Sequence, residues 1–478
     1  MTPFIAFLVI GGYFLLLIFI SFLTSRKADN QTFFTGNRQS PWFLVAFGMI
    51  GASLSGVTFI SVPGWVASTQ FTYMQMVLGF LLGYFVIATV LMPLYYRLNL
   101  VSIYTYLETR FGFWSYKTGA FFFLLSRVIG SSFRLFLVAG VLQIAMFDVW
   151  GIPFWVTVLI TIALIWLYTF KGGIKTIVWT DSLQTLFMLL AVATTIIYIG
   201  EELSLSTSGL INAVTDSEYS KIWVWEWSSG NNFFKQFFSG AFIAIVMTGL
   251  DQDMMQKNLT CKNIGEAQKN MFWFSTILVV VNVLFLALGV LLFIYANHNG
   301  IDIPNRTDDL FPMLALNHFN LFSGIVFLLG ITAAAYSSAD SALTSLTTSF
   351  CVDFLGFEKE GKQINKKATR IKVHLGFSIV LFVVILLFRL INDESIISLV
   401  YKAAGYTYGP LLGLYAFGLF TKFSVKDKWV PWVCILSPLL SIGINEITQG
   451  WLGFFILVVN GAITFLGLLL IKEAGAKK

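Results

Sequence analysis

The chain has 478 residues, of which 57% are hydrophobic and 11% are charged, and its mean hydropathy is +0.81. Because ordinary soluble domains carry about 25% charged residues, this composition excludes a soluble globular protein and indicates a polytopic membrane protein. The 30 basic and 24 acidic residues give a formal net charge of +6 at pH 7.

Apolar runs of helical length follow one another along the chain. A helix of about 20 residues crosses a hydrocarbon core of about 30 Å, and only helices and closed barrels span membranes. We therefore predict an all-α polytopic membrane protein with about thirteen transmembrane helices. In chain order, the predicted helices cover residues 3–24, 42–67, 74–95, 118–147, 152–170, 175–200, 233–258, 271–298, 321–348, 373–391, 395–420, 431–446 and 452–472.

Lys and Arg are unevenly distributed between the predicted loops. Loops on one side hold 23 of them, including Lys257 at the end of segment 233–258, whereas the other side holds two, Lys221 and Arg306. Since cytoplasmic loops are enriched in Lys and Arg, we expect the N-terminus outside and the C-terminus in the cytoplasm. The positive net charge thus reflects membrane topology, and nothing in it indicates a nucleic-acid partner.

Five basic residues lie within or at the ends of predicted helices, namely Arg127, Arg134, Lys235, Arg389 and Lys402, and four of them divide into two kinds. Lys235 and Arg389 lie near helix ends, from which a long side chain can reach the membrane interface. Arg127 and Arg134 lie seven residues apart on one face of helix 118–147, near its middle third. They are expected either to pair with a neighbouring acid or to clamp the carboxylate of a substrate.

Four acids are expected to be buried within predicted helices, namely Asp181, Asp251, Asp253 and Asp340. An ionised carboxylate near the bilayer centre costs about 2.5–3.5 kcal/mol on insertion scales, so it normally faces a partner or a cavity. Asp251 and Asp253 lie near a cytoplasmic helix end and are expected to be structural. Asp181 and Asp340 lie deeper, each six to eight residues from a cytoplasmic helix end, so we expect them at one depth and in one site.

The segment GMIGASLSGVTF, residues 48–59, carries three glycines and three hydroxyl residues. Such a composition weakens a helix and frees backbone carbonyls beside protein or a water-filled cavity, although close packing through small residues is an alternative explanation. In segment 321–348, Ser337, Ser341 and Thr344 fall along one helical face. Hard cations prefer oxygen ligands, so the two surfaces together predict a cation site near the bilayer midplane.

These segments resemble the sodium:solute symporter family. The matching pieces are GASLSGVTFISVPGWV (51–66), YLETRFG (106–112), GGIKTIVWTDSLQ (172–184), DQDMMQKNLTCKN (251–263) and AAAYSSADSALTS (333–345). The resemblance implies one transporter domain over residues 1–478, built on two inverted five-helix repeats with interrupted helices. The repeats would cover 42–200 and 233–420, with an extra N-terminal helix at 3–24 and two C-terminal helices within 431–472.

The resemblance also implies two sodium sites. The first would use the backbone carbonyls of Gly51, Leu54 and Ala334 together with the hydroxyls of Ser337 and Ser338. A second site, formed in sialic acid members by an aspartate and serines, would here involve Asp181, Asp340 and Ser341. Asp340 stands where those members have a serine. Three roles are open for its carboxylate: a charged sodium ligand, a proton-linked group or a purely structural group.

Substrate-facing positions follow from the same resemblance. They would be Ser53, Ser55 and Thr58 on the interrupted helix, and we include Tyr73, Gln75, Arg127 and Arg134. In sialic acid members an arginine pairs with the substrate carboxylate, and a straight alignment places Gly130 there, about one turn from both arginines. Sugar-transporting members have aromatic residues where this chain has Met247 and Thr248, which disfavours a sugar-stacking gate.

We therefore predict a sodium-coupled symporter in the plasma (inner) membrane that imports a small organic solute by alternating access. The solute would be sialic acid or another carboxylate, or a sugar or polyol; an ion channel and a sodium-coupled transporter of an inorganic anion or amino acid are the alternatives. An enzyme is not expected, because no metal-binding or nucleophile motif occurs around the three histidines. The expected partners are sodium ions, the solute and lipid, with no obligate protein partner, and the three cysteines indicate no disulfide framework.

Overall fold

The computed structural model describes residues 2–25, 30–170, 173–357, 366–390 and 396–473, and the regular secondary structure of these residues is helical. The α-helices are α1 (Pro3–Thr24), α2 (Asn30–Thr35), α3 (Trp42–Thr69), α4 (Tyr73–Val86), α5 (Met92–Arg97), α6 (Thr105–Arg110), α7 (Phe113–Leu142), α8 (Phe154–Thr169), α9 (Ile174–Glu202), α10 (Thr207–Thr215), α11 (Phe233–Ala244), α12 (Gln252–Asn258), α13 (Ile264–His298), α14 (Leu310–Met313), α15 (Leu321–Ser349), α16 (Lys366–Phe388), α17 (Ile396–Thr407), α18 (Gly409–Phe420), α19 (Val430–Ile447) and α20 (Ile456–Leu470).

Short tighter or wider turns extend or connect these helices. The π-helical segments are Ile87–Leu91, Gln143–Phe147, Ile245–Gly249, Leu314–His318 and Phe350–Phe354. The 3₁₀ segments are Gly36–Arg38, Gln70–Thr72, Glu218–Ser220, Thr307–Asp309, Asp427–Trp429 and Gly453–Phe455.

Nine helical stretches in the described part of the chain are long and apolar enough to cross a membrane, and ten if the bent pair Phe233–Gly249 and Gln252–Asn258 counts as one span. The longest stretch, Trp42–Arg97, has 56 residues and would measure about 84 Å if straight, far more than one crossing needs. The backbone turns within it at Gln70, which has a φ of 55°. The prediction of an all-α, multi-pass membrane protein is confirmed, whereas the count of thirteen stays a prediction.

The loop charges that predicted the topology are only partly described. Seven of the basic residues assigned to cytoplasmic loops lie outside the described residues, namely Arg26, Lys27, Lys171, Lys359, Lys362, Lys477 and Lys478.

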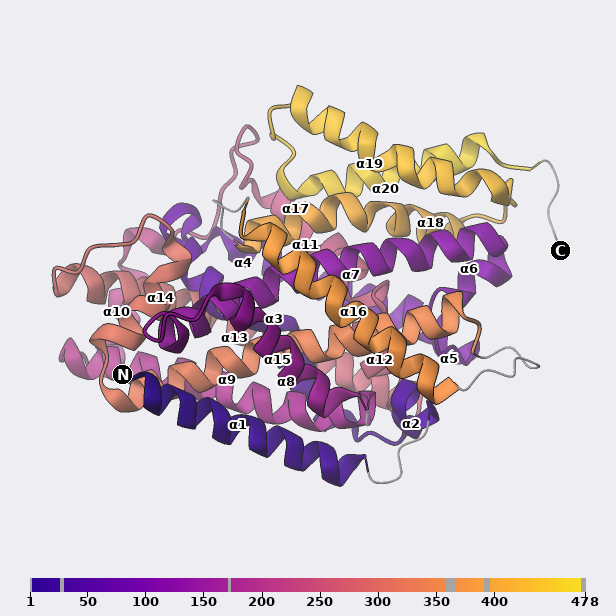
Figure 1. The fold of residues 1–478 in the computed structure, drawn as a ribbon. Helices are drawn as coiled ribbons and strands as arrows, with labels where there is room; N and C mark the ends of the chain where they lie inside the picture. Colours follow the sequence, from indigo (N-terminus) through magenta and orange to yellow (C-terminus); the bar gives the residue numbers. More distant parts are fainter. Residues whose placement is uncertain (1, 26–29, 171–172, 358–365, 391–395, 474–478) are drawn as a thin grey trace.

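Three helices, α3, α9 and α15, pack along one another at the centre of the bundle. α15 is buried on all sides between Ile331 and Ser349, which places the hydroxyl-rich stretch of the sequence in the interior. In Figure 1, α1 lies at one edge of the bundle and α18, α19 and α20 at the opposite edge. Apolar side chains such as Phe19 of α1 and Leu439 of α19 are exposed there, as expected of surfaces that face lipid.

Two of the apolar helices are broken. α3 is interrupted at Ser55, whose φ of 40° and ψ of 171° are not helical, which confirms the predicted interruption within residues 48–59. The prediction of one continuous helix over 233–258 is wrong. There the chain leaves its π-helical turn at Leu250 and is extended at Asp251, and α12 restarts at an angle of 69° to α11. The Asp251 carboxylate caps this new helix by accepting from the backbone N–H of Asp253 at 2.9 Å.

Helices α4 and α11 touch through their backbones. A Cβ at Gly79 would overlap the carbonyl oxygen of Phe237, and a Cβ at Gly240 would overlap that of Met76. Glycine is therefore required at both positions for this approach, because any larger residue would separate the two helices.

The Lys235 side chain reaches the loop segments beyond the start of α11. Its side chain is 5% exposed, and its ammonium lies 3.6 Å from the centre of the Trp451 ring. It also donates to the carbonyls of Ser229 and Trp451, both at 3.2 Å. Carbonyl acceptors and an aromatic face replace water here, so the lysine joins the start of α11 to the segment before α20.

Candidate sodium and substrate sites

A cavity lies beside the break in α3 and is lined by residues of α3, α4, α7, α11 and the π-helical turn that follows it, α12, α13 and α17. We call it the α3 pocket. Six of the seven predicted substrate-facing residues line it, namely Ser53, Ser55, Thr58, Tyr73, Arg127 and Arg134. The seventh, Gln75, lies outside it and is completely buried. Its amide accepts from the N–H of Val224 at 3.1 Å and donates to the carbonyl of Asn231 at 2.9 Å, so it holds the segment before α11.

The break divides α3 into two half-helices whose ends face different surroundings. The first half ends at Leu54, so the carbonyls of its last turn lack regular intrahelical partners and carry the negative end of the helix dipole. The second half begins at Gly56, and its positive end lies beside Ser55 and Thr58 at the α3 pocket. One break therefore exposes carbonyl oxygens, which suit a cation, and a positive helix end, which suits an anion.

Arg127 pairs with two acids. Its guanidinium is in direct contact with the Asp253 carboxylate and lies 3.6 Å from Oδ2 of Asp251. The Tyr408 hydroxyl also donates to Oδ2 of Asp251. Of the two predicted alternatives, the ion pair is therefore present at Arg127, and Asp251 and Asp253 have the structural contacts that were predicted for them.

Arg134 lies on the same face of α7 as Arg127 but has different surroundings. It is 8% exposed and lines the α3 pocket, and the described part of the chain contains no ion-pair partner for it. Its Nε has no hydrogen-bond partner either. Gly130, between the two arginines, would allow a Cβ without any neighbour within 4 Å. Arg134 thus brings to the pocket a guanidinium that has no ion-pair partner among the described residues.

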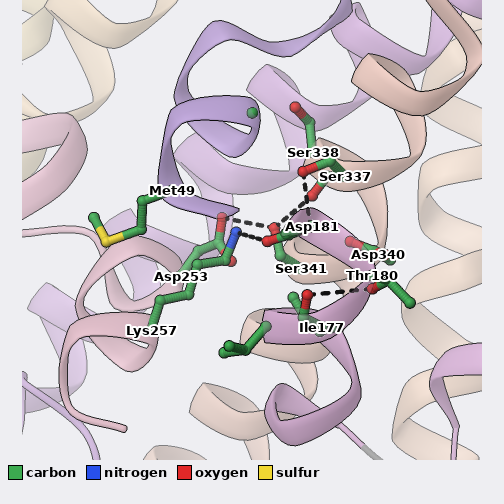
Figure 2. A network of polar contacts seen from close by, with 12 residues as sticks. Met49, Ile177, Thr180, Asp181, Asp253, Lys257, Ser337, Ser338, Asp340 and Ser341 are labelled. Atoms are coloured by element: carbon green, nitrogen blue, oxygen red, sulfur yellow. Dashed lines mark hydrogen bonds and ion pairs between the residues drawn. The ribbon is translucent and has the colours of Figure 1, made fainter. Parts of the chain in front are cut away.

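Asp181 on α9 lies at the centre of a polar network (Figure 2). Its Oδ1 accepts from the Ser337 hydroxyl at 2.7 Å, and its Oδ2 lies 2.7 Å from the ammonium of Lys257 on α12. The other two predicted ligands of the second sodium site have separate partners. Oδ2 of Asp340 accepts from the Tyr168 hydroxyl at 2.9 Å, and Ser341 donates to Oδ2 of Asp253 at 3.2 Å.

The prediction that Lys257 belongs to a cytoplasmic loop is wrong. Its side chain is 2% exposed and lies within the polar network (Figure 2). The signal in the sequence is the spacing of Asp253 and Lys257, because residues four apart share one face of a helix. The two side chains on that face of α12 contact residues of α7, α9 and α15.

A model of the sodium:solute symporter family matches residues 33–425 of the chain. The chain belongs to this family. A sodium/sialic acid symporter of Proteus mirabilis is 24% identical, over 96% of this chain and 95% of that protein, and one of Aliivibrio fischeri is 25% identical, over 96% and 90%. A sodium-coupled monocarboxylate transporter of Danio rerio is 23% identical over 85% of this chain and 66% of its own length.

The fold agrees with that of a solved family structure. A substrate-bound, outward-open Na⁺-coupled sialic acid symporter superposes with a TM-score of 0.83 at 21% identity, covering 99% of each chain. This symporter is thus a multi-pass membrane transporter with sodium as its coupling ion, as predicted.

The residues of the first predicted sodium site fit such an ion. The carbonyls of Gly51 and Leu54 belong to the last turn before the break. Ser338 is completely buried, and its hydroxyl makes only a long bond of 3.4 Å to the carbonyl of Ala334. Ser337 uses its proton on Asp181, which leaves the lone pairs of its oxygen free for a cation. α3 and α15 pack together at this level.

Proposed function

We propose that this symporter imports a small organic anion whose carboxylate is bound by Arg134 and by the positive end of the second half of α3. The observation that carries the proposal is the unpaired guanidinium of Arg134 in the α3 pocket. A buried cation without a partner is costly, and a bidentate carboxylate supplies the charge and the acceptors that it lacks. The named substrates of the relatives, sialic acid and monocarboxylates, belong to the same chemical class.

A sugar or polyol is the second candidate, since Ser53, Ser55 and Thr58 offer hydroxyls to the pocket. It is less well supported, because a neutral solute would leave Arg134 uncompensated. Met247 and Thr248 also line the pocket, at the place where sugar-transporting members would have an aromatic surface.

We further propose thirteen transmembrane segments in two inverted repeats, at 42–200 and 233–420, flanked by 3–24 and by two C-terminal helices within 431–472. Each proposed repeat contains one broken helix, α3 in the first and α11 with α12 in the second. This correspondence supports the division into two repeats. The shorter apolar helices Phe154–Thr169 and Gly409–Phe420 supply further crossings. The N-terminus would lie outside and the C-terminus in the cytoplasm, in the plasma (inner) membrane.

Coupling would follow from the shared break in α3. Sodium, as co-substrate, would be held by Gly51, Leu54, Ala334, Ser337 and Ser338. Those ligands fix the break, and the same break sets the positions of Ser53 and Ser55 in the pocket, so ion and solute favour one conformation of α3. Alternating access then exposes both sites first to one side of the membrane and then to the other.

An outer gate is proposed at Tyr73 and Tyr401. Their hydroxyls lie 2.9 Å apart, joining α4 to α17 across the pocket, and both rings line it. In the proposed topology this contact lies between the bound solute and the outside.

The test is a thermal-shift screen of the purified protein with N-acetylneuraminate, lactate and galactose, each with and without sodium. We expect sodium-dependent stabilisation by a carboxylate and none by galactose, and we expect Arg134→Met to remove it while sodium alone still stabilises. Arg389→Met is the matched control, because Arg389 stacks on Phe154 away from the pocket. Equal stabilisation by galactose in the wild type and in Arg134→Met would overturn the proposal.

A further inference from the structure

The ion pair between Asp181 and Lys257 occupies the place where the resemblance implies a second sodium ion. The exposed fractions of the two side chains are 1% and 2%, and Oδ2 and Nζ are 2.7 Å apart. Asp181 lies on the central helix α9 and Lys257 on α12, and Figure 2 shows the lysine extending from α12 to the carboxylate.

The side chains around Asp181 do not fit a sodium ion in addition to the Lys257 ammonium. Both carboxylate oxygens are engaged, Oδ1 by Ser337 and Oδ2 by Lys257. Oδ2 of Asp340 accepts from Tyr168 while its Oδ1 has no hydrogen-bond partner, and Ser341 donates to Asp253 and to the carbonyl of Ser337. The charge of Lys257, and not a shortage of oxygen atoms, therefore opposes a second cation here. A cation held by oxygen ligands needs several of them to converge at about 2.3–2.6 Å, and two cations on one buried carboxylate would repel each other.

Hydrogen bonds hold the end of α12, the helix that carries Lys257. The last residue of its helix, Asn258, is fixed by the Tyr96 hydroxyl at 2.9 Å and by the Asn270 amide at 2.6 Å. Among the described residues, neither Nζ of Lys257 nor Oδ2 of Asp181 makes a well-directed hydrogen bond. The two atoms face each other as an ion pair. Charge compensation, rather than a network of hydrogen bonds, is therefore what the lysine provides.

We propose that the Lys257 ammonium replaces the second cation at Asp181, so that this symporter carries one sodium ion per cycle, at the site between α3 and α15. The inference rests on the proposed function for its transport consequence. One sodium ion with one monovalent carboxylate moves no net charge, so the membrane potential, worth about 2.3 kcal/mol per charge per 100 mV, does not drive uptake.

The test measures bound ²²Na⁺ per purified chain, together with thermal stability against sodium concentration. We expect one sodium ion in the wild type. In Lys257→Met the uncompensated Asp181 should recruit a second ion, so that two are bound and the stability curve becomes sigmoidal. The double variant Asp181→Asn, Lys257→Met removes both charges and should return to one. Lys262→Met, at an exposed position on the same side, is the control and should also bind one.

The wild-type count decides the question even if Lys257→Met does not fold. Two sodium ions per wild-type chain, or potential-driven uptake of a monocarboxylate in liposomes, would overturn the inference and leave the proposed solute class intact. One bound sodium ion without stabilisation by any carboxylate would instead overturn the proposed function and leave the lysine substitution standing.

Discussion

At the scale of single residues, the position of a hydroxyl decides what it can bind. Ser338 and Ser345 lie two turns apart on the same buried helix, and both are completely buried. Ser345 is satisfied by the carbonyl of Ala342 at 2.9 Å, whereas the bond from Ser338 to Ala334 is long, at 3.4 Å. Ser338 therefore retains an oxygen for a cation beside the break in α3.

From this difference we expect Ser338→Ala to weaken sodium binding about 10–100-fold, which is the usual effect of losing a group at a metal site. Ser345→Ala is the control and should leave the sodium affinity within about a factor of 3, or about 0.6 kcal/mol. Sodium titrations of thermal stability would measure both. Similar losses in the two variants would show that the serines support packing and not the ion.

The two arginines of α7 have different partners, and the sequence did not predict which of them forms the ion pair. Both were predicted to lie on one helical face, and both line the α3 pocket. Only Arg127 meets Asp251 and Asp253, because the break in the 233–258 segment brings those carboxylates to it. The spacing of residues along α7 contains no information about that break.

At the scale of helices, backbone contact makes some glycines irreplaceable. The contact of Gly79 with Phe237 joins α4, which carries Tyr73 of the proposed gate, to α11, one half of the second broken helix. Gly11 of α1 has nothing within 4 Å of its absent Cβ. The two glycines therefore differ in tertiary packing although both lie within apolar helices.

We expect Gly79→Ala to destabilise the protein by about 1–3 kcal/mol through overpacking, and Gly11→Ala to be neutral or slightly stabilising because alanine favours the helix. Thermal unfolding in detergent, followed by tryptophan fluorescence, would compare the midpoints. Equal midpoints for the two variants would mean that α4 and α11 can separate without cost.

At the scale of the whole molecule, the native thiols are protected. Burial raises the pKa of the Cys261 thiol to about 12, and Cys351 and Cys434 are completely buried in the bundle. Because the thiolate is the reactive form, all three should resist alkylation in the folded protein near neutral pH. This low background makes the proposed membrane orientation testable with introduced cysteines.

We expect Ser208→Cys, at an exposed position of α10, to react with an impermeant maleimide in intact cells. Lys428→Cys, exposed before α19, should react only after the membrane is opened. The wild type serves as the unlabelled control. The reverse pattern of labelling would invert the proposed topology and would place the Tyr73–Tyr401 contact on the cytoplasmic side.

The sequence by itself determined the membrane class, the approximate positions of the apolar helices, the interruption of α3 and the resemblance that identified the family. These properties depend on local composition, because hydropathy, helix propensity and loop charge act over neighbouring residues. The tertiary structure decided that Arg134 is unpaired, that the 233–258 segment is bent, and that Lys257 faces Asp181, 76 positions earlier in the chain. Ion pairing depends on distances between side chains of different helices, and only the packed bundle sets those distances.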